Sequence, residues 1–321
     1  MRLVRSLLRI VTAAVVLGAM GFLALAVALR QPVVTATAWR GGARADARTL
    51  EAHVRFLTND VRPRGAAYPE NLDRAARYIA GHFRAAGGRT SLQTFDARGR
   101  RYSNVVAEFG PASSGDAVLV IGAHYDAFTE TGPLPGADDN ASGTAGLIEL
   151  ARLLGRSDVR RPVVLVAYTT EEPPFFGSEQ MGSAVHAASL ASPVRGMICL
   201  EMIGYFAETQ SWPNALFRWI YPTRGDFIGV AGGWNDRHLA REVKRAIAGA
   251  GGIRVVSFSG PRETSDASDH RNYWARGWPA VMVTDTAFLR NPHYHTAHDT
   301  AETLDYARMA RVVDGVLNAA L

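Results

Sequence analysis

Val118-Leu-Val-Ile-Gly-Ala-His124-Tyr-Asp126 decides the fold, because an uninterrupted apolar run ends directly in a histidine and an aspartate. A short continuous apolar run is typical of a strand that is buried on both faces of a parallel sheet. An acidic loop follows, Pro135-Gly-Ala-Asp-Asp139-Asn-Ala-Ser-Gly143, and leads into a helical pattern over residues 142–154. A strand, a polar loop and a helix in this order predict one unit of an α/β domain.

Similar units extend in both directions from this stretch. We expect strands at residues 90–95, 103–108, 117–123, 163–169, 196–202, 227–231, 255–258 and 280–283. Helical patterns are expected at residues 47–59, 70–86, 142–154, 179–188, 236–250, 270–276 and 307–320. This alternation predicts a three-layer α/β/α sandwich with a mixed, mostly parallel central sheet. The length of 321 residues is compatible with one large domain, over residues 46–321.

The first 30 residues predict a membrane signal. Residues 10–29 are apolar or small and follow Arg2, Arg5 and Arg9, and about 20 such residues can span a bilayer as a helix. We favour an uncleaved signal anchor that leaves the arginines in the cytoplasm and the rest of the chain outside it. Ala26-Val-Ala28 resembles a cleavage site, so a signal peptide and secretion are the alternative. Residues 31–45 are expected to form a flexible leader.

The positive charge of the chain is concentrated near its N-terminus. The formal net charge is +5, but six arginines precede the first acidic residue, Asp46, and leave 29 basic and 30 acidic residues behind them. Because such a body lacks the basic surface that nucleic acid requires, we expect no nucleic-acid partner. The single cysteine, Cys199, lies in an apolar run and is predicted to be a buried strand residue. It excludes an intramolecular disulfide and a thiolate cluster, so any metal ligands must be histidines and carboxylates.

Histidines and carboxylates follow the predicted strands or lie in the loops between them. They are His124, Asp126, Asp139, Glu171, Glu172, Glu201, and the three histidines His293, His295 and His298. Because the carboxyl ends of parallel strands meet at one edge of a sheet, we expect these side chains to converge there. Zinc binds histidine nitrogen and carboxylate oxygen. Each residue alone is more often structural, but their joint occurrence at successive strand ends indicates a metal site.

The sequence resembles the M28 family of metallopeptidases, the co-catalytic zinc aminopeptidases, from about residue 49 to its end. The resemblance rests on Gly122-Ala-His124-Tyr-Asp126, Pro135-Gly-Ala-Asp-Asp139-Asn-Ala-Ser-Gly143, Thr170-Glu171-Glu172, Ser268-Asp269-His270 and His295-Thr-Ala-His-Asp299-Thr300. It implies that residues 46–321 form a catalytic domain holding two Zn²⁺ ions. Asp139 would bridge the ions, His124 and Glu201 would complete one site, and Glu172 and His295 would complete the other.

The resemblance also implies catalytic roles. Glu171 would be the general base, and Asp126 would orient His124 and fix its tautomer. The position of Glu201 is commonly aspartate in the family, so this chain must accommodate an additional methylene. Asp269 is expected to be an outer-sphere residue. The implied function is a zinc-dependent exopeptidase, most simply an aminopeptidase that acts on peptides with a free N-terminus.

Other functions on the same fold remain open at this stage. They are a glutaminyl cyclase-like acyltransferase, which uses one zinc, a carboxypeptidase, and a binding protein that has lost its ligands. Because every ligand position is filled, the sequence favours two metals and an enzyme. Pro173-Pro-Phe-Phe176 follows the two glutamates. Its aromatic side chains could line a substrate pocket or pack in exposed positions, and the sequence does not decide between these roles.

Overall fold

The computed structural model describes residues 2–32, 35–112 and 115–321. Its centre is one eight-stranded sheet in the order β1-β2-β4-β3-β5-β8-β6-β7. The strands are β1 (Arg89–Ala97), β2 (Arg100–Phe109), β3 (Val118–His124), β4 (Val163–Tyr168), β5 (Val194–Glu201), β6 (Phe227–Gly233), β7 (Arg254–Gly260) and β8 (Ala280–Thr284). Each strand overlaps a predicted one.

The middle of the sheet is parallel. β4, β3, β5 and β8 run in the same direction as neighbours, and their carboxyl ends therefore share one edge. β1 and β2 form an antiparallel hairpin that joins β4 antiparallel. On the other side β6 pairs antiparallel with β8 and parallel with β7. The predicted mixed, mostly parallel sheet is confirmed.

Alternation of side chains along the central strands builds two apolar layers. In β3, Leu119 and Ile121 belong to the larger core, whereas Val118 and Val120 belong to the cluster on the opposite face. β5 behaves in the same way, because successive strand residues point to opposite faces. Cys199 is fully buried in the smaller cluster, as the sequence predicts. Both faces of the central strands are therefore covered, which explains their continuous apolar sequence.

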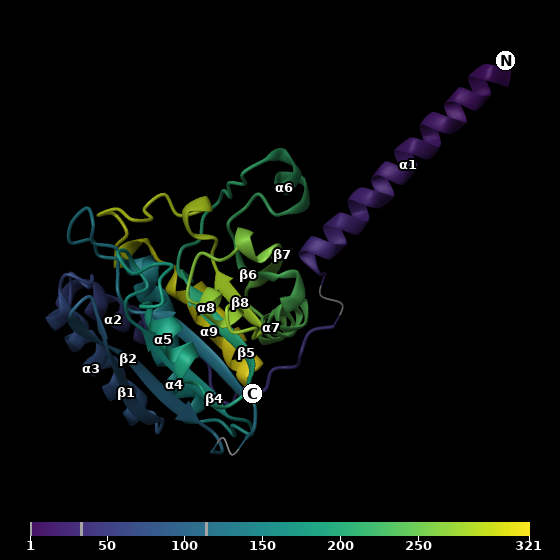
Figure 1. Cartoon of the computed structure of the whole chain (residues 1–321). Coiled ribbons are helices and arrows are strands. Elements are labelled where there is room, and N and C mark those ends of the chain that lie inside the picture. Colours follow the sequence, from purple (N-terminus) through teal and green to yellow (C-terminus); the bar gives the residue numbers. More distant parts are fainter. Residues whose placement is uncertain (1, 33–34, 113–114) are drawn as a thin grey trace.

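Helices cover both faces (Figure 1). On the larger core lie α2 (Ala47–Arg55), α3 (Pro69–Ala85), α4 (Gly143–Leu154), α7 (Arg237–Ala250) and α9 (Tyr306–Ala320). On the other face α5 (Gly182–Ser189) packs against α8 (His270–Trp274). This arrangement confirms the three-layer α/β/α architecture. The short helix α6 (Ala215–Ile220) has no predicted counterpart, because six residues are too few for a recognisable helical period.

The N-terminal helix α1 (Arg2–Arg30) projects away from the body (Figure 1). Its part from Arg5 to Arg30 is long and apolar enough to cross a membrane, by length and composition. The described part of the predicted leader lies against α7 and α9. The Thr37 backbone N–H donates to the Arg245 carbonyl, and that of Ala45 to the Asp314 carboxylate. The domain boundary after residue 45 and the flexibility of the leader stay predictions.

Candidate metal centre and active site

The predicted site residues meet at the carboxyl edge of the parallel strands. His124 ends β3, Glu201 ends β5, and Glu171 and Glu172 directly follow β4, which lies on the other side of β3. Asp139 comes from the segment Ala137–Ser142 that leads into α4, and its own backbone is not helical. Parallel pairing brings these strand ends side by side, so residues far apart in sequence share one small volume.

Three of these side chains form a first group. The Nε2 atom of His124 lies 3.4 Å from Asp139 Oδ1 and 3.4 Å from Glu201 Oε2. All three residues are buried, and their ligand atoms lie close enough to hold one metal ion. One imidazole nitrogen and two carboxylate oxygens match the donor preference of zinc.

A second group shares Asp139 with the first. The Nε2 atom of His295 lies 3.0 Å from Asp139 Oδ2 and 3.6 Å from Glu172 Oε1. The two oxygens of Asp139 therefore face different histidines. Glu172 Oε1 and His295 Nε2 are buried yet lack a hydrogen-bond partner. Buried polar atoms are normally satisfied, so these two unpaired atoms fit a site that is completed by a cation.

Aromatic rings hold His295 in place. Phe128 stacks on one side at a centroid distance of 4.0 Å, and Tyr294 stacks at 3.8 Å. The backbone of His295 is left-handed, with φ of 55°. His293 and His298, which the sequence could not separate from His295 without the resemblance, belong to neither group of potential ligands. His270 is buried and its ring contacts the Ser265 carbonyl and Trp274, which agrees with a structural role.

Glu171 lies beside the first group without belonging to it. Its Oε2 is 3.8 Å from His124 Nε2, and the residue is buried. Burial raises the pKa of Glu171 well above its usual value; His124 opposes this shift, and the carboxylates of Glu172 and Glu201 add to it. A carboxylate with a raised pKa is a stronger base, which suits a residue that must accept a proton near neutral pH.

Charge is concentrated in the site. Burial lowers the pKa of His124, but Glu171 and Glu201 outweigh burial and the net pKa is raised well above the usual value. Burial raises the pKa of Asp139, but the nearby imidazoles of His124 and His295 reverse this effect and lower it. Burying several carboxylates together is costly unless cations compensate them. The electrostatics of the site therefore fit bound divalent metal ions.

Asp126 supports the site from behind. The Nδ1 atom of His124 lies 3.2 Å from the backbone oxygen of Asp126 and 3.5 Å from its carboxylate, which leaves Nε2 directed at Asp139 and Glu201. The Asp126 carboxylate also accepts hydrogen bonds from the backbone N–H groups of Glu171, at 3.2 Å, and Glu172, at 3.0 Å. It therefore orients a histidine and fixes the turn that carries both glutamates.

Glu201 has its own support. Its Oε2 accepts a hydrogen bond of 2.5 Å from the Ser268 hydroxyl, whose oxygen lies 3.3 Å from the thiol of Cys199. The Asn140 amide donates to the Leu200 carbonyl at 2.8 Å. The hydrogen bond from Ser268 holds the Glu201 carboxylate in place, and the contact from Asn140 fixes the end of β5.

Two further residues support the loops of the site, and the sequence did not predict a role for either of them. The Asp299 carboxylate accepts hydrogen bonds from the backbone N–H groups of Asp138, at 2.9 Å, and Asp139, at 3.1 Å. Asp299 belongs to the His-Thr-Ala-His-Asp motif, so the sequence contained a signal that could have indicated its supporting role. Arg64 is fully buried and donates to the carbonyls of Tyr125, Pro135 and Gly136. No local pattern indicates such an arginine.

Asp269 is fully buried next to the site, as the sequence suggests, and burial raises its pKa to about 7.

The two aromatic residues after the glutamates differ from each other. Phe175 is buried and packs edge-on against Tyr102, whereas Phe176 is exposed beneath the Arg271 guanidinium. Exposed packing therefore describes Phe176 and not Phe175, whose ring is buried.

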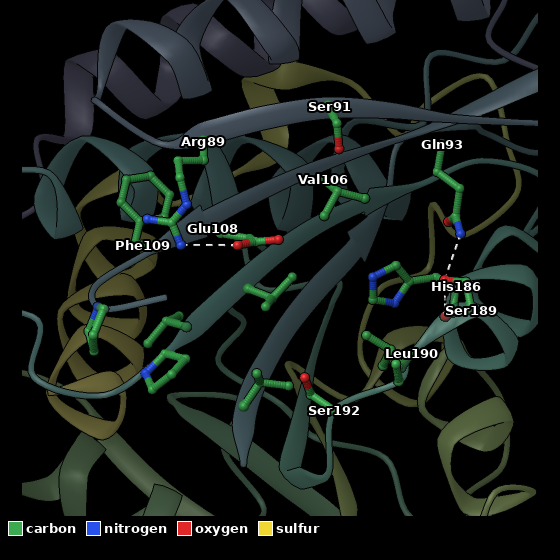
Figure 2. Close-up of a pocket in the computed structure, with 16 residues that line it drawn as sticks. Arg89, Ser91, Gln93, Val106, Glu108, Phe109, His186, Ser189, Leu190 and Ser192 are labelled. Carbon is green, nitrogen blue, oxygen red and sulfur yellow. Dashed lines mark hydrogen bonds and ion pairs between the residues drawn. The ribbon is translucent and has the colours of Figure 1, made fainter. Parts of the chain in front are cut away.

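A separate groove lies on the sheet face next to α5, with a cavity volume of about 250 Å³ (Figure 2). Arg89, Val106 and Glu108 line it from the hairpin, and His186 lines it from α5. Figure 2 shows Arg89 and Glu108 paired across the strands, at 3.0 Å. None of the predicted site residues lines this groove, so the candidate chemistry belongs to the other location.

Comparison with known proteins adds a family to this geometry. Residues 104–320 match the family model described as Peptidase family M28. The chain belongs to this family. The resemblance stated from the motifs is thereby confirmed for this M28 chain.

Relatives of this M28 chain include a bacterial protein of similar length. "Uncharacterized protein YfbL" of Escherichia coli strain K12 is 49% identical over 278 residues, which cover 84% of this chain and 85% of that protein. "Probable leucine aminopeptidase" of Trichophyton verrucosum is 29% identical over 64% of this chain and 53% of that protein. The chain thus spans about half the length of this fungal relative.

Solved structures share the fold of this M28 chain. The aminopeptidase LapA of Legionella pneumophila superposes with a TM-score of 0.70 at 21% identity, covering 86% of this chain and 71% of LapA. A glutaminyl cyclase of Porphyromonas gingivalis superposes with a TM-score of 0.67 at 18% identity, covering 86% of this chain and 98% of the cyclase. At these identities the likeness establishes the fold, which both activities share.

Proposed function

We propose that this chain is a zinc-dependent aminopeptidase with two zinc ions in its site. The observation that carries the proposal is the pair of ligand groups that share Asp139, one with His124 and Glu201 and the other with Glu172 and His295. A bridging carboxylate between two groups of donors is the arrangement that a two-metal hydrolytic site needs. Membership of family M28 and the name of the fungal relatives support peptide bonds as the target.

The residues around the two groups supply the remaining steps. Zinc held there would lower the pKa of a water molecule and polarise the scissile carbonyl. Glu171 lies within 3.8 Å of the His124 ligand atom, so its carboxylate can take the proton of the attacking water and return it to the leaving amine. Asp126 keeps His124 and the two glutamates in the geometry that this proton transfer requires.

The electrostatics favour a substrate with a free amine. Glu171, Glu172 and Glu201 are buried carboxylates in one site, and the positive α-ammonium group of a peptide would be attracted to them. Phe128 and Tyr294 stack on the two faces of His295 and place aromatic surface next to the second ligand group. We therefore expect activity toward peptides that begin with an apolar residue.

The first experiment is hydrolysis of a panel of aminoacyl arylamides by the full chain in detergent. We expect cleavage of leucyl and phenylalanyl arylamides, loss of cleavage with a chelator, and recovery when zinc is restored. The matched N-acetyl arylamides should remain intact, because blocking the amine removes its positive charge. Cleavage of blocked and free substrates at equal rates would contradict the assignment as an aminopeptidase.

The glutaminyl cyclase alternative is tested in the same preparation. A glutaminyl peptide would release ammonia and form an N-terminal pyroglutamate if the chain were a cyclase. Release of ammonia without hydrolysis of any arylamide would replace the proposed function with this one.

We also propose that α1 is an uncleaved signal anchor. Arg5 and Arg9 precede the apolar run and would stay in the cytoplasm, which places the catalytic domain on the other side. The test is protease treatment of intact and opened cells, together with the mass of the mature chain. A soluble chain that lacks residues 1–28 would instead indicate a cleaved signal peptide.

A further inference from the structure

The short helix α6 is apolar on two sides. Phe217 and Ile220 face the body and pack in a cluster with Phe227 and Val256. On the outer side Leu216 is 46% exposed and Trp219 is 81% exposed. A tryptophan that exposed is unusual in a globular protein, because its large apolar ring is stabilised by removal from water. Contact of the outer side of α6 with another apolar surface would therefore be stabilising.

That outer side lies next to α1. The Trp219 ring meets the Phe22 ring edge-on, with centroids 6.4 Å apart and an interplanar angle of 80°. Phe22 precedes Arg30 by eight residues, which corresponds to about 12 Å along a helix axis. It lies well inside the uncharged run of residues 10–29. Trp219 thus lies beside the apolar part of α1 and not beside its charged end.

The end of α1 is fastened to the body. Lys244 on α7 donates hydrogen bonds to the backbone carbonyls of Arg30, at 2.5 Å, and Gln31, at 3.0 Å. The Gln31 amide donates to the Ser259 hydroxyl on β7. These contacts reach from two elements of the body to the last turn of α1. The end of α1 is therefore held by α7 and β7, and the contact of Phe22 with Trp219 joins α1 to α6.

A cavity of about 430 Å³ lies between α1 and β7. Its walls include Leu23, Ala26 and Val27 of α1 and Val255 and Val256 of β7, while Arg30, Lys244 and Arg254 line it as well. A lining that combines apolar side chains with cations suits a phospholipid, whose acyl chains are apolar and whose phosphate is negative. This cavity is continuous with the surface of the helix that is proposed to cross the bilayer.

We propose that α6 is a second membrane contact, in which Leu216 and Trp219 enter the bilayer leaflet that surrounds the C-terminal half of α1. Tryptophan is enriched at the boundary between lipid and water, and interfacial helices insert their apolar side into this boundary. Arg218 on α6 and Arg30 on α1 would remain at the level of the headgroups. The inference rests on the proposed anchoring by α1 and is independent of the catalytic proposal.

Spin labels on single cysteines test this placement in the full chain. Cys199 is buried and is replaced by alanine, and single cysteines are introduced as Trp219→Cys, Leu216→Cys, Phe22→Cys and Leu92→Cys. Leu92 on β1 is 45% exposed and matches Leu216 as a control on the outer strand of the sheet. The protein is reconstituted into vesicles of phosphatidylcholine and phosphatidylglycerol, and circular dichroism checks that each variant is folded.

The readout is the collision of each label with oxygen, which enters lipid, and with a nickel chelate, which stays in water. We expect the ratio of oxygen to nickel collisions to be several-fold higher at positions 219, 216 and 22 than at position 92. A ratio at both α6 positions equal to that at position 92, with position 22 in lipid, would overturn the contact while leaving the anchor. Position 22 in water would overturn the anchor and the contact together.

Discussion

Asp299 accepts a hydrogen bond of 3.1 Å from the backbone N–H of Asp139, although 160 residues separate them in the chain. The same carboxylate accepts from the N–H of Asp138. Two such bonds fix the peptide that carries the proposed bridging ligand, so the late loop of the chain controls the orientation of a side chain that follows β3. A hydrogen bond inside a protein contributes about 0.5–1.5 kcal/mol to stability.

Asp299→Asn should therefore weaken zinc binding while leaving the ligands in place. The asparagine amide presents a donor where the two backbone donors need an acceptor. We expect the affinity for zinc to fall about 10- to 100-fold, the range found when outer partners of ligands are changed. Competition with a fluorescent chelator measures this, and Asp158→Asn, an exposed change, is the control. Unchanged affinity in Asp299→Asn would mean that this contact does not orient Asp139.

Glu171→Gln should abolish turnover and preserve the metals. The glutamine cannot accept a proton, and Glu171 belongs to neither ligand group. We expect kcat to fall about 10²- to 10⁴-fold, the contribution typical of general acid–base catalysis. Glu179→Gln, an exposed change in the same loop, should retain full activity. Substantial activity in Glu171→Gln, with zinc bound, would remove this residue as the base.

Asp139→Ala should lose both zinc ions, because Asp139 is the residue that the two ligand groups share. His295→Ala should lose only one ion, since the group of His124 and Glu201 keeps its members. His293→Ala in the same loop should keep two. Metal content of the purified variants, measured by mass spectrometry, distinguishes these outcomes. A stoichiometry near two in Asp139→Ala would show that this residue does not bridge the ions.

Buried neutral histidines should make the protein sensitive to acid. Burial lowers the pKa of His186 from 6.5 to about 4. The unfolded chain therefore binds a proton below pH 6.5 that the folded chain does not bind until about pH 4. The stability contributed by neutral His186 is present above pH 6.5 and is lost as the pH falls through this window.

Chemical denaturation of the zinc-free chain at pH values from 7 to 4 tests this expectation. Each histidine of this kind should add up to about 1.4 kcal/mol per pH unit to the slope of the free energy of unfolding. His186→Gln should lower that slope, whereas His238→Gln, an exposed change, should not. Equal slopes for the parent chain and His186→Gln would contradict the assigned protonation.

Local sequence determined the strands and most of the helices. Val118 to Ala123 is apolar at every position or glycine, and only a strand covered on both faces accommodates such a run next to a polar loop. His124 and Glu201 were placed correctly at strand ends for the same reason. The overall fold therefore follows from short patterns whose physical cause, burial of alternate side chains, operates over a few residues.

The turn after β4 required the tertiary structure. Glu171 and Glu172 are neighbours, and on a regular strand they would point to opposite faces. Thr170 adopts a left-handed backbone with φ of 56°, and the Asp126 carboxylate holds both glutamate N–H groups. The carboxylate that stabilises this turn lies on a different strand end, so no local pattern contains the information.

By itself, then, the sequence determined at which strand ends the histidines and carboxylates lie, and it predicts that these side chains carry the chemistry. Only the tertiary structure decided which groups hold them in position. Arg64 and Asp299 form hydrogen bonds with backbone carbonyls and N–H groups, which every sequence has. The residue types along the chain therefore do not indicate where the partners of these two side chains lie. The contact of Trp219 with Phe22 likewise joins two apolar segments of the chain, and neither segment by itself indicates that the other is its partner. Long-range packing, which satisfies buried polar atoms and pairs apolar faces, makes these choices.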